Sequence, residues 1–98
     1  MLFSIRITKY QNDLMLNICD APLLGKKLVE KKLKMHISES YYGERLVEKE
    51  EAENLLKQCA SINMVGKETI SLSVSLGIGS QNGVKEIDGV PFLIVFKV

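Results

Sequence analysis

The amino-terminal residues alternate between apolar and polar side chains, and this pattern constrains the fold more than any other feature. Apolar residues occupy every second position from Phe3 to Ile7 and again from Leu14 to Ile18, with turn-forming residues at 11–13. A period of two is typical of a half-buried β-strand. The sequence therefore predicts an antiparallel hairpin over residues 2–19.

A helical pattern replaces this alternation between residues 47 and 60. Ala52, Leu55, Leu56 and Cys59 follow the spacing i, i+3, i+4, i+7 and form one apolar stripe. Glutamates near the start of this segment suit the positive end of a helix dipole. We therefore interpret the charged residues as the solvated face of a helix and not as an acidic catalytic centre.

The other segments give weaker signals. Residues 33–37 alternate and predict a third strand, whereas residues 23–28 fit either a short helical turn or an irregular loop. Asp88-Gly89 is a two-residue turn signal and predicts a closing hairpin over 84–98. Residues 69–76 alternate strictly, which by itself favours a strand, although Gly77 and Gly79 resemble a helix stop.

Length and composition limit the classes of protein that remain. A chain of 98 residues, 46% of them hydrophobic, is expected to form a single α+β domain over residues 1–98. The sequence contains neither an apolar run of about 20 residues nor a signal-peptide pattern, so we expect a cytoplasmic protein without a membrane partner. The net charge of +1 does not by itself indicate nucleic acid or membrane as a partner.

Neither the two cysteines nor the single histidine indicates a bound cofactor or metal. Cys19 and Cys59 lie far apart without a Cys-x-x-Cys pair, so we expect two reduced thiols, with a disulfide between them as the open alternative. His36 has no partner at a spacing that suits a zinc site. Cys19-Asp20 is a further candidate for a nucleophile beside a base, but nothing in the sequence supplies a cationic neighbour for the thiol.

Lysines are concentrated in one short segment, which is the strongest partner-binding signal in the chain. Five of the 13 basic residues lie within nine positions, whereas six of the 12 acidic residues lie between Glu39 and Glu53, so the charge is bipolar. Clustered lysines can contact several phosphates, and nearby tyrosines can stack on bases or pack in a core. The candidate residues are Lys26, Lys27, Lys31, Lys32, Lys34, Tyr41 and Tyr42. The alternative is a solvated lysine-rich loop beside two structural tyrosines.

A second candidate site follows at Asn63, Gly66 and Lys67. If a helix begins near Gly66, its first amide groups are unpaired and can hold a phosphate, with Lys67 adding charge. Alternatively, Asn63 only turns the backbone and Gly66 only provides a bend. The Walker A spacing is absent, so this element is not a P-loop.

An ordered set of short motifs resembles a known family. The motifs are residues 18–20, 23–26, 38–43, 63–67 and 87–91, and they cover almost the whole chain. Together they resemble the archaeal domain of unknown function 424 family. This resemblance implies a helix over 67–77, against the alternation noted above. It also implies a histidine after the carboxy-terminal proline, where this chain has Phe92.

These observations combine into one prediction of fold and function. We expect an α+β fold with a mostly antiparallel sheet of about five strands and two helices packed on one face. The poor catalytic inventory favours a binding module that contacts RNA or a ribonucleoprotein, without a cofactor or metal. The alternatives are a protein-interaction or structural subunit, which includes a homodimer, and a small enzyme that acts on a phosphorylated substrate.

Overall fold

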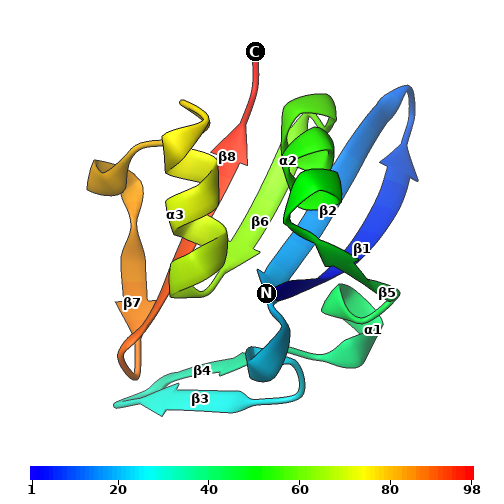
Figure 1. Cartoon of the computed structure of the whole chain (residues 1–98). Coiled ribbons are helices and arrows are strands. Elements are labelled where there is room, and N and C mark those ends of the chain that lie inside the picture. The colour runs from blue at the N-terminus through cyan, green and yellow to red at the C-terminus, as the bar shows by residue number, and fades with distance from the viewer.

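A six-stranded sheet forms the centre of the computed structural model, which describes residues 1–98 (Figure 1). Its strands lie in the order β5-β1-β2-β6-β8-β7, and all neighbours are antiparallel except β2 and β6. The α+β class and the mostly antiparallel sheet are therefore confirmed, but the prediction of about five strands is too low. The strands are β1 (Leu2–Tyr10), β2 (Asp13–Asp20), β5 (Arg45–Glu48), β6 (Ser61–Val65), β7 (Lys85–Ile87) and β8 (Val90–Phe96).

Both predicted hairpins are present. In β1 and β2, Tyr10 pairs with Asp13 across a tight turn, and in β7 and β8, Ile87 pairs with Val90. Asp88 and Gly89 have φ angles of 53° and 77°, and positive φ at both central positions is the conformation that a type I′ turn requires. The local turn chemistry therefore fixes the register of this hairpin.

Two helices cover one face of the sheet, as expected: α2 (Lys49–Gln58) and α3 (Lys67–Ser75). The helix implied by the family resemblance is thus present, and the strand favoured by alternation is wrong. Ile70 and Leu72 are buried against the sheet in this helix, together with the small side chain of Ser73. Tertiary packing therefore overrides the local period of two.

The helix face of the sheet carries the larger core. Its 14 buried residues come from α2, α3 and every second position of the central strands, including Ile5, Leu16 and Ile62. Lys97 closes one end of this layer, because its Nζ donates to the carbonyls of Leu56 and Lys57 at 2.6 and 3.0 Å. These carbonyls belong to the last turn of α2, where helices lack intrahelical partners.

A two-stranded ribbon partly covers the opposite face. It consists of β3 (Lys27–Glu30) and β4 (Leu33–His36), and it is followed by the short helix α1 (Glu39–Tyr42). The strand predicted over 33–37 is therefore present, but it pairs with β3 and not with the sheet. The ribbon and α1 enclose a second core of six buried residues, which includes Cys19, Leu28, Tyr42 and Val65. Two short 3-10 turns, Ala21–Leu23 and Gln81–Gly83, complete the chain.

None of the helices has the length and the apolar character needed to cross a membrane.

Candidate functional site

All five lysines of the predicted basic segment lie on or beside the ribbon and are exposed. Leu28 pairs with Met35, and both point toward the sheet. Because side chains alternate along a strand, Lys27 and Lys34 point away from the sheet. Lys31 and Lys32 form the tip of the ribbon, and Lys26 directly precedes β3. The lysines therefore form a basic outer surface of the ribbon.

The two tyrosines of α1 have opposite environments. Tyr42 is 7% exposed and packs in the second core, whereas Tyr41 is 64% exposed. Burial raises the pKa of the Tyr42 phenol to about 12, with a smaller contribution from the Cys19 thiol. Only Tyr41 is therefore available to a ligand, because the ring of Tyr42 is sealed inside the protein.

The turn before α3 has an internal partner for its amide groups. The Asp20 carboxylate accepts hydrogen bonds from the backbone N–H groups of Glu68 and Thr69 at 3.1 and 2.8 Å, and from Thr69 Oγ1 at 2.7 Å. A Cβ at Gly66, whose φ is 112°, would collide with this carboxylate. The expectation that these amides are unpaired is therefore wrong. The N–H groups of Glu68 and Thr69 are not free to hold a phosphate beside Gly66 and Lys67.

Asn63 takes part in a different arrangement. It lies between Ile62 and Met64 in β6, and since those side chains pack on the helix side, Asn63 projects from the opposite face. Its Nδ2 donates to Asn17 Oδ1 at 2.8 Å, and Asn17 Nδ2 donates to the Tyr41 carbonyl at 3.0 Å. This chain of hydrogen bonds brings two predicted site residues, Asn63 and Tyr41, into one place.

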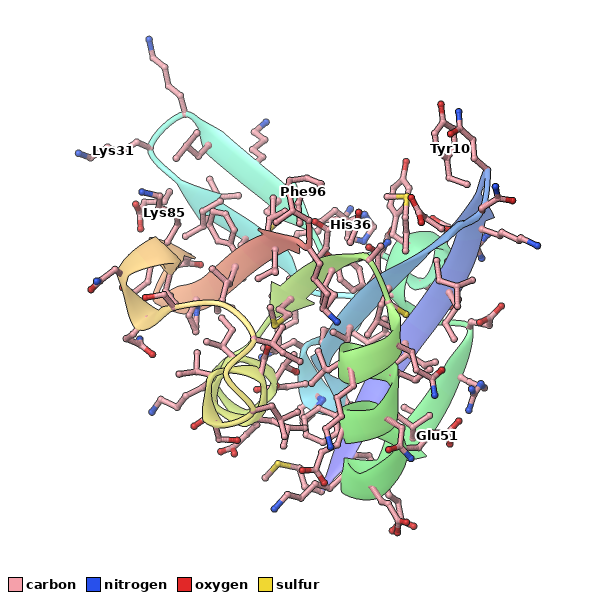
Figure 2. All side chains as sticks on the ribbon, turned by 90° about the horizontal axis from the view of Figure 1, so that it is seen from above. Tyr10, Lys31, His36, Glu51, Lys85 and Phe96 are labelled. Carbon is pink, nitrogen blue, oxygen red and sulfur yellow. The ribbon has the colours of Figure 1, made fainter.

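The ribbon and α1 leave part of this sheet face uncovered, and we call this part the open face. The strand registers align its side chains in two rows across four strands. The first row is Arg6, Asn17, Asn63 and Ile94, and the second is Thr8, Met15, Ser61 and Phe96. Figure 2 shows His36 of the ribbon and Phe96 on the side of the sheet that faces away from the helices.

The open face combines chemical groups that packing alone does not require. Phe96 is 74% exposed and Ile94 52%, although both lie on a strand of the central sheet. Arg6 provides a cation at one end of the first row, and the two asparagine amides lie between Arg6 and Ile94. Aromatic, cationic and amide groups on one flat surface can stack on, pair with and hydrogen-bond a planar polar ligand.

Neither cysteine has the environment of a reactive thiol. Burial, with a smaller effect from the Asp20 carboxylate, raises the pKa of Cys19 to about 12, and burial also raises that of Cys59. Cys19 lies under the ribbon and Cys59 on the helix side, so both are free thiols in different cores. No group of three or more His, Cys, Asp or Glu side chains is arranged to hold a metal ion.

A surface hollow of about 370 Å³ lies on the helix side, between the start of α2 and α3. Lys49, Glu68 and Ser71 are among the residues that line it. No hydrogen bond joins these three side chains to one another, so the hollow lacks the nucleophile–base contact of a hydrolytic site.

Comparison with known proteins supports the family resemblance seen in the sequence. A family described as "Protein of unknown function (DUF424)" matches residues 8–98. The chain belongs to this family. DUF424 carries no assigned reaction, so membership leaves the function open.

The fold also occurs in a solved structure. The crystal structure of an uncharacterized conserved protein from Methanopyrus kandleri superposes with a TM-score of 0.81 at 24% sequence identity, over 100% of this chain and 95% of the other. This likeness establishes a shared fold. No curated protein matches the sequence significantly. In this DUF424 chain, Phe92 packs beside the second core.

Three site residues were not apparent from the sequence. Asn17 alternates with Leu16 and Ile18, which placed it on the polar side of its strand but gave no sign of a partner. Phe96 and Arg6 were assigned only to strands. Their alignment depends on pairing between distant segments, above all the parallel contact of β2 with β6.

Proposed function

We propose that this protein binds single-stranded RNA on the open face, with the basic surface of the ribbon beside it. The observation that carries the proposal is the exposed Phe96 ring beside the polar Ser61, on a sheet whose other face packs against α2 and α3. Sheet surfaces with exposed aromatic rings are a common platform for unstacked bases. An exposed apolar ring has an energetic cost in water that a stacked base relieves.

The asparagine pair supports a role in recognition. The Tyr41 carbonyl can only accept a hydrogen bond, so it fixes the orientation of the Asn17 amide. Asn17 Oδ1 in turn accepts a hydrogen bond from Asn63 Nδ2, so the Oδ1 of Asn63 points away from Asn17. Both amides are thus held in place before a ligand arrives, and this reduces the entropy lost on binding.

The charge distribution supports a polyanionic partner on this side. Figure 2 shows Lys31 and Lys85 at one end of the molecule and Glu51 at the opposite end. The ribbon lysines have no ion pair with an acidic side chain, since the chain contains one salt bridge, between Arg45 and Glu51. Unpaired lysines release counterions when they contact phosphates, which makes binding salt-dependent.

A direct test compares the affinity of charge variants for RNA. Fluorescence anisotropy with a labelled single-stranded RNA of about ten nucleotides gives the dissociation constant at low and moderate salt. We expect Lys27→Glu/Lys34→Glu to weaken binding and to reduce its salt dependence. Lys57→Glu is the matched control, because Lys57 is an exposed lysine of α2 on the other side of the sheet.

The aromatic contact needs a separate variant. Phe96→Ala is expected to weaken RNA binding by about 1–3 kcal/mol, the usual value of one stacked base. Equal, negligible binding by the wild type and all variants would remove the proposal. Tighter binding to duplex RNA than to single strands would also contradict it, because a paired base cannot stack on the open face.

A further inference from the structure

The carboxy-terminal half of β8 has an unpaired edge. β7 pairs only with Val90–Phe92, so no strand lies beside Leu93–Phe96 on that side. Bonds from Lys97 N–H to the Ala60 carbonyl and from Gly66 N–H to the Pro91 carbonyl show that odd-numbered residues of β8 face β6. Since backbone groups alternate in direction along a strand, Ile94 and Phe96 direct their N–H and C=O groups outward.

The part of β1 that β5 leaves unpaired is protected, in contrast to this part of β8. β1 pairs with β5 only over Leu2–Ile5, but the Glu44 side chain accepts from the Ile7 N–H at 3.3 Å, and the charged Lys9 follows. Charged side chains of this kind block unwanted strand pairing. The β8 edge has no such device, because residues 92–96 are all apolar and contain no proline.

We infer that two copies of this chain pair through their β8 edges as an antiparallel, two-fold symmetric dimer. Two-fold pairing makes the same segment complementary to itself. β7 occupies the edge up to Phe92, so pairing over residues 93–97 is centred on Val95, and Val98 of each copy turns away because Lys85 already lies beside Phe92. Ile94 of each copy then lies opposite Phe96 of the other, as a hydrogen-bonded pair.

The side chains agree with this register. Ile94 and Phe96 project from the same face of β8, so each isoleucine packs against an aromatic ring across the new strand pair. Lys97 does not interfere, because its Nζ is bonded to the end of α2 on the helix side. The two open faces become one continuous surface. This inference does not depend on RNA binding.

Oligomeric state is the first test, measured by sedimentation equilibrium on nuclease-treated protein. We expect a dimer at twice the 11.0 kDa of one chain, and a rise of about tenfold or more in its dissociation constant with Ile94→Lys. Leu46→Lys is the matched control, since Leu46 is an equally exposed apolar residue on the opposite edge strand, β5. A monomer at every concentration, or a dimer that Ile94→Lys leaves intact, would overturn the inference.

The register is tested by disulfide formation between two single-cysteine variants, Ile94→Cys and Phe96→Cys. Directly opposed residues have Cα atoms about 5.5 Å apart, which a disulfide spans, whereas diagonal neighbours are too distant. We expect the mixture to form a covalent dimer under mild oxidation faster than either variant alone. The native Cys19 and Cys59 are buried and do not compete. Equal rates for the mixture and the separate variants would contradict this register.

Discussion

The two faces of the central sheet come from the same strands but differ in how they are covered. On the helix side, Ile5, Leu16 and Ile62 are fully buried beneath α2 and α3. On the opposite side, the ribbon and α1 cover only the row nearest to them, where Cys19 and Val65 lie. The side chains of the helix face are explained by packing, whereas those of the open face are not. This difference is the reason why we propose the open face as the ligand surface.

The largest expected effect comes from a matched pair of substitutions on opposite faces. Ile62→Ala removes a buried side chain and should lower the free energy of unfolding by about 2–5 kcal/mol. At a protein concentration where the chain is monomeric, Ile94→Ala removes the same atoms from the open face and should change the free energy of unfolding by about 0.5 kcal/mol or less. Urea denaturation of both variants measures the contrast. Similar losses in the monomer would mean that the open face is packed as tightly as the helix face.

Asp20 joins the sheet to the helix layer, and its removal should have the next largest effect. Asp20→Ala leaves the first amides of α3 without their acceptor and should cost about 1–2 kcal/mol. Asp20→Asn is the control, because its amide oxygen still accepts one of the bonds. Denaturation followed by helix circular dichroism measures both. If Asp20→Ala melts like the wild type, the carboxylate does not cap this helix.

The reactivity of Cys19 and Cys59 reports separately on the two layers that cover the sheet, the ribbon and the helices. Leu28→Ala should loosen the ribbon over Cys19, so Cys19 reacts faster with iodoacetamide at neutral pH while Cys59 stays protected by the helices. Mass spectrometry of labelled peptides over time measures each site. Equal labelling of Cys19 and Cys59 in this variant would show that the two layers open together.

Burial of the second core also predicts an alkaline limit to stability. The pKa of Cys19 rises from 9.0 to about 12 in the folded chain. Below pH 9 the thiol is protonated in both states, whereas above pH 9 the unfolded chain loses its proton first. Stability should therefore hold up to pH 9 and fall as the pH rises toward 12. In Cys19→Ala, the urea midpoint should fall less between pH 9 and pH 12 than it does in the wild type. If the midpoint falls equally in both proteins, other titrating groups cause the loss of stability.

Elements whose signals lie within their own segment could be predicted from the sequence, whereas elements that depend on distant contacts could not. The hairpin of β1 and β2 follows from alternation, and the β7–β8 turn follows from Asp88-Gly89, because both signals lie within the paired segment. The sequence did not predict β6, because its residues resemble a turn and its parallel pairing with β2 cannot be seen in the sequence. Residues 67–75 show the limit of periodicity, since serines alternate there and yet the segment packs as a helix.

The candidate site was only partly predictable for the same reason. The lysine segment was visible as composition, and its side chains are exposed, as both the binding hypothesis and the solvated-loop alternative require. The sequence could not separate Tyr41 from Tyr42, because their burial is decided by contacts with distant strands. It also could not show that Asp20 fills the helix start, or that Asn17 and Asn63 meet across 46 positions of the chain.

We propose that the open face is the ligand surface. Titration of isotope-labelled protein with single-stranded RNA, followed by amide chemical shifts, tests it residue by residue. We expect shifts along the ribbon and on the open face, with α2 and α3 unchanged. The open-face residues concerned are Arg6, Asn17, Asn63 and Phe96. Shifts confined to the helices, or none at saturating RNA, would contradict it.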